Sequence, residues 1–325
     1  MPRVSVVIPV YNSAKFLHKC IGSLLAQTEK DCEFIFVNDG SKDDSANIIG
    51  SYGETDDRIR LINQENKGVS DARNTGIAHT TARYVAFVDA DDTVAPDYFQ
   101  TLLQTMSLHD ADLSVCGFIG SEERFLPDGK ITLDKTDEAK IIALFESFLI
   151  HNVYCKLYLR DIIIGHDLRF DPAFNFGEDF LFNLQYLQNI KTIATSSEVL
   201  YYYDVSVPDS LAKQYHIARY KAVEIQIQAT ADYFQSIGLS SRQKAGYVNA
   251  LYYCNAYDAA HNLYVTIDKT PKHEAADTIK AILGFRYFNS DISHTECESL
   301  IVRIFSLKNP TLIQWLLRLH RKMRR

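Results

Sequence analysis

The sequence lacks both of the glycine-rich loops that most often cradle nucleotide phosphates. No Gly-x-Gly-x-x-Gly turn follows the first predicted strand, where a nicotinamide-binding Rossmann unit needs one. A loop ending in Gly-Lys-Ser/Thr is also missing, which excludes the usual phosphate loop of ATPases and GTPases. The first strand leads instead into Pro9-Val10-Tyr11-Asn12-Ser13. A ligand held there must be accommodated without glycines, and the aromatic ring of Tyr11 can stack on a base.

Long apolar runs and paired cysteines are missing too. No stretch approaches the roughly 20 apolar residues that cross a bilayer. Because the sequence starts directly in a strand pattern at residues 4–9, we expect no signal peptide. The cysteines have no paired spacing, which argues against a zinc site, and several lie in apolar runs. We therefore expect reduced thiols and a cytoplasmic protein. The cysteines are Cys20, Cys32, Cys116, Cys155, Cys254 and Cys297.

Basic residues are scarce in the first two thirds of the chain. Residues 1–210 contain 18 Lys and Arg against 32 Asp and Glu, whereas residues 211–325 contain 16 against 9. An acidic region is a poor partner for nucleic acid, so we expect none to bind. A phosphate ligand in that region requires a cation, and the basic region can face an anionic partner.

Two hydrophobic periods alternate over the first hundred residues. Short β-rich runs at 4–9, 33–37, 59–62 and 84–88 are separated by helical spacing at 14–27, 44–52, 69–79 and 96–108. This alternation predicts an α/β fold with a mainly parallel central sheet. Beyond residue 116 we predict a hairpin or surface loop over 124–133, helices over 137–149 and 178–187, and a strand over 199–205.

From residue 210 the pattern is helical, and it predicts helices over 210–236, 240–263, 272–283, 293–306 and 311–323. The period and the charge both change near Pro208. We therefore predict an α/β domain over residues 1–208 and a helical domain over 209–325.

Three carboxylates follow the predicted strand at 84–88, namely Asp89, Asp91 and Asp92. Such crowding is costly unless a cation lies on it, and Mg²⁺ or Mn²⁺ commonly shares oxygen ligands with a substrate's phosphates. Open α/β sheets also bind ligands at the carboxyl ends of their strands. The turn therefore suggests a metal–diphosphate site. Asp-rich surface turns and caps are the alternative.

Two further segments carry polar side chains at the ends of predicted elements. Asp39 follows the second strand and can accept a hydrogen bond from a ring N–H such as that of uracil; an Asp-Gly turn with a helix cap is the alternative. Arg73 lies one turn into a helix that begins after Gly68, where its guanidinium can reach a nucleotide; an exposed helix arginine is the alternative.

Together these motifs resemble the family 2 inverting glycosyltransferases, in order and spacing, clearly from residue 3 to about 100 and reasonably to about 205. They are Val7-Ile8-Pro9-Val10-Tyr11-Asn12, Val37-Asn38-Asp39-Gly40-Ser41, Asn66-Lys67-Gly68 with Ala72-Arg73-Asn74, and Phe87-Val88-Asp89-Ala90-Asp91-Asp92. The resemblance implies a GT-A fold, a nucleotide-diphosphate sugar, most often a uridine one, and Mn²⁺ or Mg²⁺.

By position, the resemblance places Pro9, Tyr11 and Asp39 at the nucleotide base and Arg73 in support of the nucleotide. The resemblance also implies that Asp89 lies near the ribose and that Asp89 and Asp91 bind the metal. Asp92 is a supporting partner of that site or caps the following turn.

An inverting transfer also needs a base for the acceptor hydroxyl. The family places it in a Glu-Asp pair that begins a helix, which Phe176-Gly177-Glu178-Asp179 fits. The resemblance implies that Asp179 is the base and that Glu178 orients it or contacts the acceptor. The alternative is a pair of helix-start carboxylates without a chemical role.

Two positions depart from the family pattern. Cys155 precedes Lys156 where the family usually has Asn-Lys; we place Lys156 at the donor or acceptor, with a surface lysine as the alternative. Asp204 stands where relatives often carry an Arg or His that closes over the diphosphate. Lys213 and His216 are the candidates to replace it.

The segment 311–325 is apolar and then basic. Lying at an interface, it can insert Leu312, Trp315, Leu316 and Leu319 while its arginines meet anionic lipid. Packing of the same residues on a domain core is the alternative.

We therefore expect a metal-dependent transferase that moves a sugar from a nucleotide-diphosphate donor, UDP-linked in our hypothesis, to a hydroxyl of a glycan or lipid-linked acceptor. We expect it in the cytoplasm, at the inner face of the plasma membrane, in surface-polysaccharide biosynthesis. One competing hypothesis is a silent nucleotide-sugar-binding subunit. A sugar nucleotidyltransferase is the other, although it requires a Gly-rich N-terminal loop that is missing here.

Overall fold

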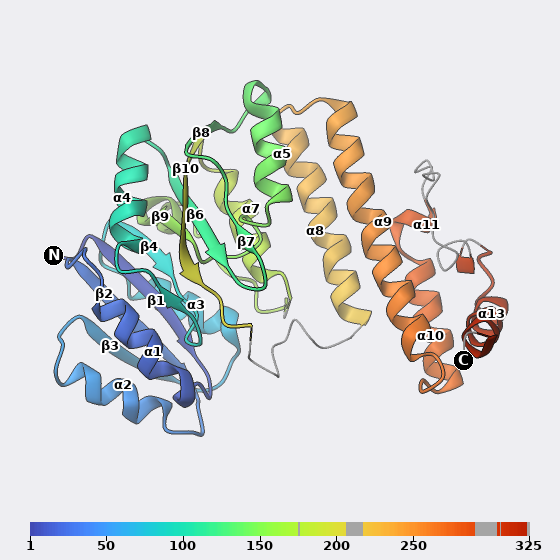
Figure 1. Cartoon of the computed structure of the whole chain (residues 1–325), viewed down its shortest axis with the longest axis horizontal. Helices are drawn as coiled ribbons and strands as arrows, with labels where there is room; N and C mark the ends of the chain where they lie inside the picture. Colours follow the sequence, from blue (N-terminus) through green and yellow to red (C-terminus); the bar gives the residue numbers. More distant parts are fainter. Residues whose placement is uncertain (175, 206–216, 290–303, 306, 324–325) are drawn as a thin grey trace. The chain divides into compact units, whose positions relative to one another are not determined.

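The computed structural model describes residues 1–174, 176–205, 217–289, 304–305 and 307–323. Two compact units make up the chain, Met1–Pro208 and Asp209–Arg325. The first contains an open sheet flanked by helices, and the second is helical (Figure 1).

A ten-stranded sheet organises the first unit, with the strand order β3–β2–β1–β4–β9–β6–β10–β5. The pairs β1–β2, β2–β3, β1–β4 and β6–β10 are parallel, whereas β9 lies antiparallel between β4 and β6. The predicted α/β fold with a mainly parallel sheet is confirmed. The strands on this path are β1 (Val4–Val10), β2 (Cys32–Asp39), β3 (Ile59–Gln64), β4 (Tyr84–Phe87), β5 (Thr93–Val94), β6 (Leu113–Ile119), β9 (Lys156–Leu159) and β10 (Thr192–Tyr202).

Helices cover both faces of the sheet. On one face, α1 (Ala14–Leu25) packs Leu17 and Ile21 into a core cluster with β1 and β2. On the other, α3 (Val69–Ala78) packs Ala72 into a second cluster with Ile35 and Val37 of β2. Strands covered on both faces are near-continuous apolar runs, as β1 and β2 are. The other helices of this unit are α2 (Ser45–Gly53), α4 (Tyr98–His109), α5 (Glu138–Glu146), α6 (Arg160–Gly165) and α7 (Glu178–Leu187), with the 3₁₀ turn η1 (Lys135–Asp137).

We predicted a hairpin or a surface loop over 124–133. The hairpin is wrong, whereas residues 125–128 are irregular and largely exposed, as in a surface loop. Strand β7 (Glu123–Arg124) pairs with β6, and β8 (Gly129–Thr132) pairs with β10, so the two strands extend different neighbours. Strands β6 and β9 and helix α6 were not predicted, since their short apolar runs carry no clear period.

The second unit contains α8 (Ile217–Ser236), α9 (Ser241–Thr266), α10 (Lys272–Leu283), α11 (Arg286–Asn289) and α13 (Pro310–Met323). Four of the five predicted helices are present here, and the one predicted over 293–306 falls mainly outside the described residues. Within the described ranges, no helix combines the length and the apolar character that crossing a membrane requires.

Candidate active site

The carboxyl ends of three neighbouring parallel strands meet at one edge of the sheet. The register pairs Val10 of β1 with Asn38 of β2, and Val7 of β1 with Phe87 of β4. Tyr11, Asp39 and Asp89, which follow these pairs, therefore lie at the same edge. This is the edge at which open α/β sheets bind ligands.

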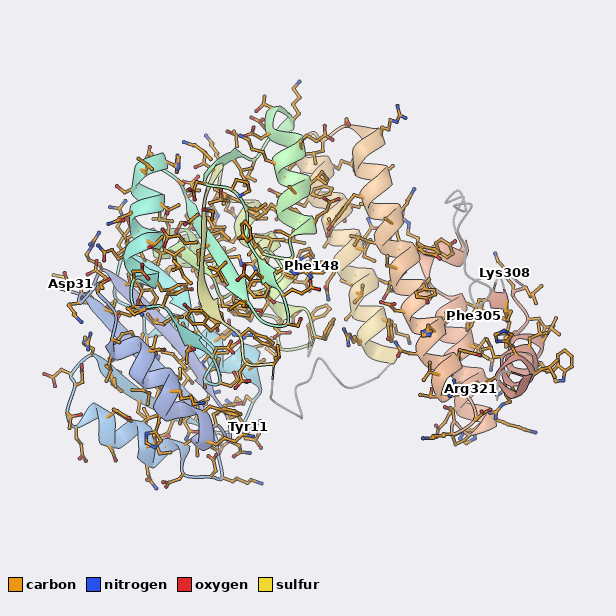
Figure 2. The ribbon with its side chains drawn as sticks, in the orientation of Figure 1. Tyr11, Asp31, Phe148, Phe305, Lys308 and Arg321 are labelled. Atoms are coloured by element: carbon orange, nitrogen blue, oxygen red, sulfur yellow. The ribbon has the colours of Figure 1, made fainter. Side chains whose placement is uncertain are left out.

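Tyr11 remains open to solvent at this edge, with 49 % of its surface exposed (Figure 2). Pro9 lies just before it in β1, opposite Val37. The following turn is braced, because Asn12 Oδ1 accepts a 2.8 Å hydrogen bond from the Lys42 amide and Asn12 holds a left-handed φ of 51°. Tyr11 is thus an exposed ring on a fixed turn, free to stack on a base.

Asp39 is buried, and both of its carboxylate oxygens accept hydrogen bonds from neighbouring residues of the fold. Its Oδ1 accepts hydrogen bonds from the Lys67 amide (2.9 Å) and Gln64 Nε2 (2.8 Å), and its Oδ2 accepts one from the Gly68 amide (2.8 Å). The carboxylate therefore holds the entrance of α3, a role that differs from the predicted alternative of an Asp-Gly turn with a cap of the next helix. Contact between Asp39 and a base remains a prediction.

Arg73 joins three carboxylates from two distant segments. Its Nη1 donates to Asp179 Oδ1 at 2.6 Å and to Glu178 Oε1 at 3.2 Å, and its Nη2 donates to Asp89 Oδ1 at 3.0 Å. Arg73 is only 4 % exposed, so the alternative of an exposed helix arginine is wrong. The guanidinium ties the end of β4 to the first turn of α7.

A glycine brings Arg73 to this position. A Cβ on Gly76 would lie 2.2 Å from Val7 Cγ1, so only glycine lets α3 approach β1 this closely. Asn74 then fixes the segment opposite, because its side chain exchanges two hydrogen bonds with the Phe170 backbone (2.8 and 2.9 Å). The Phe170 ring lies under the Arg73 guanidinium and stacks on Phe182 of α7 at 4.2 Å.

The acidic turn after β4 is tied to the end of β10. Asp92 is buried and accepts hydrogen bonds from Tyr201 Oη (2.6 Å) and from the Asp204 amide (2.9 Å). Tyr201 Oη in turn accepts from the Asp89 amide (3.1 Å). Asp92 is therefore a supporting residue of the turn. Burial and the charges of Asp89 and Asp91 raise its pKa to about 8.

Asp91 is the carboxylate at this turn that best fits a cation. Burial and the nearby charges of Asp89 and Asp204 raise its pKa to about 6, which is the cost of crowding carboxylates without a counter-charge. No group of three or more His, Cys, Asp or Glu side chains arranged for a metal ion occurs among the described residues. Mg²⁺ and Mn²⁺ sites shared with a diphosphate need only one or two carboxylates, so the turn fits such an ion.

Asp179 begins α7 beside the same arginine. Gly177, with a φ of 79°, starts the helix, and Asp179 follows Glu178 in the first turn. Burial raises the pKa of Asp179 to about 7; the Arg73 guanidinium opposes that rise, and Glu178 and Asp89 add to it. A carboxylate with a pKa near the working pH suits a general base.

The predicted contact of Lys156 with the donor or acceptor is wrong. It is fully buried in β9, and its Nζ donates to the carbonyl oxygens of Leu149, Asn152 and Tyr154. Because all three N–H donors are used, none is left for a nucleotide or an acceptor, and the surface alternative is equally wrong. Lys156 closes the 149–155 turn, in which Cys155 holds a left-handed φ of 61°. That conformation suits the family's Asn better than a cysteine.

Asp204 lies beside the acidic turn, and its amide is held by Asp92. Its charge therefore adds to the crowding at Asp91. Lys213 and His216, the candidates for the missing basic residue, lie outside the described residues.

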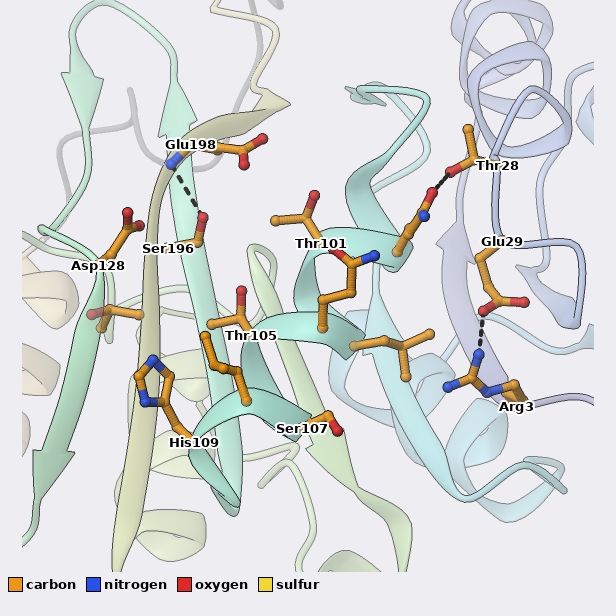
Figure 3. A pocket seen from close by; sticks show the side chains of 15 residues that line it. Arg3, Thr28, Glu29, Thr101, Thr105, Ser107, His109, Asp128, Ser196 and Glu198 are labelled. Atoms are coloured by element: carbon orange, nitrogen blue, oxygen red, sulfur yellow. Dashed lines mark hydrogen bonds and ion pairs between the residues drawn. The ribbon is translucent and has the colours of Figure 1, made fainter.

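A polar hollow of about 790 Å³ lies along α4 and the middle of β10 (Figure 3). Arg3, just before β1, pairs there with Glu29 at 2.7 Å, and residues of α4 and β10, with Thr28 and Asp128, form the remaining wall. None of the predicted site residues lines it.

Fold and site together define the class of nucleotide-sugar transferases with the GT-A fold. Residues 5–165 match the family described as Glycosyl transferase family 2. The uncharacterized glycosyltransferase EpsJ of Bacillus subtilis is 32 % identical over 309 residues, which cover 91 % of this chain and 87 % of EpsJ. The chain belongs to glycosyl transferase family 2 and is a glycosyltransferase.

One further relative and two solved structures of similar fold have substrates or ligands in their names. The poly(ribitol-phosphate) beta-N-acetylglucosaminyltransferase TarP of Staphylococcus aureus is 27 % identical over 298 residues, which cover 84 % of this chain and 90 % of TarP. The crystal structure of S. aureus TarS 1-349 with UDP-GlcNAc has a TM-score of 0.68 at 19 % identity, covering 99 % of this chain and 92 % of that one. The mannosyltransferase PcManGT of Pyrobaculum calidifontis, solved with GDP-Man and Mn²⁺, has a TM-score of 0.54 at 17 % identity, covering 96 % and 85 %.

Proposed function

We propose that this chain transfers a hexose or N-acetylhexosamine, with inversion, from a UDP-sugar to a hydroxyl of a glycan or lipid-linked acceptor in polysaccharide biosynthesis. The observation that carries the proposal is the Arg73 bridge, which holds Asp89 of the acidic turn and Asp179 of α7 on one guanidinium. TarP and TarS support the choice of donor, because TarS was solved with UDP-GlcNAc and TarP is named for the transfer of N-acetylglucosamine.

In the proposed reaction the acceptor oxygen bonds to the anomeric carbon, and the bond from that carbon to the diphosphate oxygen breaks. Asp179 takes the proton of the attacking hydroxyl. Arg73 fixes the Asp179 carboxylate and keeps part of it ionised near neutral pH. Glu178, which shares Nη1 of Arg73, orients the pair or contacts the acceptor.

On the donor side, Tyr11 provides a ring for the uracil, and Asp39 and Asp89 lie at the same edge for the base and the ribose. Asp91, with the free oxygen of Asp89, would hold Mn²⁺ or Mg²⁺. Such an ion supplies charge stabilisation to the departing diphosphate. PcManGT, which was solved with Mn²⁺, supports this choice of cofactor.

We extend the proposal to a location in the cytoplasm. Cys20, Cys32, Cys116 and Cys155 are buried free thiols and Cys254 is an exposed one, which suits a reducing compartment. We propose neither a nucleic-acid partner nor a zinc site.

The purified chain tests the proposal when it is incubated with UDP-GlcNAc and Mn²⁺, with and without acceptors that include a poly(ribitol-phosphate). Release of UDP with formation of a β-linked product supports it. A donor-dependent rise in Tm without UDP release under any condition favours the silent subunit. Pyrophosphate release from UTP and a sugar 1-phosphate favours nucleotidyl transfer.

A further inference from the structure

Helix α13 carries apolar side chains on two sides. Ile313 and Leu317, four residues apart, are fully buried within the C-terminal unit. Leu312, Trp315 and Leu319 are 40 %, 57 % and 37 % exposed. Their spacing of three and four residues makes them one stripe along the helix. The helix therefore packs with one face and leaves a second apolar face to solvent.

Polar contacts hold α13 in this rotation. Gln314 Nε2 donates to the Lys272 carbonyl at 2.7 Å, and Arg318 Nη2 donates to the Thr270 carbonyl at 2.9 Å. Arg321 Nε lies 3.4 Å from Asp268 Oδ2. These contacts fix the helix against α10 and the turn before it, so the exposed stripe cannot rotate inward without breaking them (Figure 2 labels Arg321).

The charged residues in the sequence around the stripe are all basic. Residues 299–325 contain seven Lys and Arg and no Asp or Glu. An exposed apolar stripe with a tryptophan, in a stretch whose charged residues are all basic, matches the chemistry of an anionic bilayer surface: the ring and the leucines enter the interface, while Lys308, which is exposed, and the other cations that do not bind within the unit meet lipid phosphates. We propose that α13 binds the chain to anionic membrane through Leu312, Trp315 and Leu319.

A second copy of the chain suits this stripe poorly. In a two-fold contact the same patch faces itself, so each basic segment would meet its own charge. Three partly exposed side chains also provide far less than the roughly 800 Å² per partner that stable interfaces bury. An anionic bilayer has neither problem. The proposal is independent of the donor and of the reaction.

Trp315 is the single tryptophan of the chain, so its fluorescence reports this surface alone. The full-length protein is titrated with vesicles of phosphatidylcholine, alone or mixed with phosphatidylglycerol. We expect a blue shift and co-sedimentation with the anionic vesicles only, both weakened by high salt because the screening length shortens. Leu312→Glu/Leu319→Glu, which keeps Trp315, should bind at least about tenfold more weakly.

Leu108→Glu is the matched control, because Leu108 is an exposed leucine of α4 in the other unit; binding should not change. Circular dichroism confirms that each variant is folded. Equal binding to neutral and anionic vesicles, or none to either, overturns the proposal. Concentration-dependent dimers that Leu312→Glu/Leu319→Glu abolishes, without vesicle binding by the parent chain, overturn it in favour of a second copy.

Discussion

Arg73 donates a 2.6 Å hydrogen bond to Asp179, although 106 residues separate the two in the sequence. The same guanidinium binds Asp89, so the strand that delivers the acidic turn and the helix that delivers the proposed base are fixed to each other through one side chain. Arg73 is therefore a positioning residue for Asp179 and sets part of its charge. Its predicted contact with the nucleotide remains a prediction.

Replacing Arg73 should change how activity depends on pH. As the proposed base, Asp179 must be ionised to act. Because its pKa is raised to about 7, kcat/KM of the parent chain should rise through about pH 7 and then level off. In Arg73→Met the opposing positive charge is gone, so the rise should move to higher pH, while Arg73→Lys should lie between. A structural role alone would lower activity without moving the profile. An unchanged profile in folded Arg73→Met contradicts the assignment.

Removing the metal or Asp91 should affect donor binding. With EDTA in place of Mn²⁺, the rise in Tm caused by UDP should largely disappear, because crowded carboxylates then face the diphosphate unshielded. Asp91→Asn should bind UDP with little dependence on Mn²⁺. Asp57→Asn, at an exposed carboxylate after α2, is the control and should behave as the parent chain. If UDP binding by Asp91→Asn still depends fully on Mn²⁺, other residues hold the ion.

Lys156→Met should destabilise the protein rather than weaken the donor complex. Loss of Nζ leaves three carbonyl oxygens of the 149–155 turn without their donor, at a cost of about 2–4 kcal/mol. Urea unfolding measures this cost, and Lys191→Met, at an exposed lysine, should cost less than about 0.5 kcal/mol. Normal stability with weakened UDP binding would instead show that Lys156 contacts the donor.

The close approach of α3 to β1 can be tested with two alanines. Gly76→Ala forces a methyl group against Val7 and should destabilise the chain by about 1–3 kcal/mol, with Arg73 displaced and transfer slowed. Gly22→Ala, in α1 with open space around it, should instead stabilise by up to about 1 kcal/mol. Equal effects of the two changes on unfolding would show that α3 tolerates the extra atom.

The sequence predicts well which residues lie at the carboxyl edge of the sheet. It predicts poorly the contacts that hold these residues in place. Asp39, Asp89 and Asp91 follow strongly periodic runs, so their shared edge follows from strand order alone. Helix α7 was predicted with its observed bounds because a glycine and two carboxylates mark its start. The supports depend on pairings between distant segments, such as Asn74 with Phe170 and Asp92 with Tyr201, and periodicity carries no information on them.

Lys156 is a residue whose role was predicted wrongly for the same reason. Its motif predicted contact with the donor or acceptor, but Lys156 is buried because it lies in β9, a four-residue strand between β4 and β6. No hydrophobic period distinguishes so short a strand, and a lysine within it gives no sign in the sequence that three carbonyls surround it.

The most direct measurement compares sugar transfer with donor binding in Asp179→Asn. We expect UDP-sugar affinity to stay within about twofold of the parent chain while kcat falls by about 10²–10⁴, because the amide preserves shape but accepts no proton. Asp161→Asn, an exposed carboxylate in the first turn of α6, should leave both unchanged. Transfer by folded Asp179→Asn at a rate near that of the parent chain would contradict the assignment of Asp179 as the base.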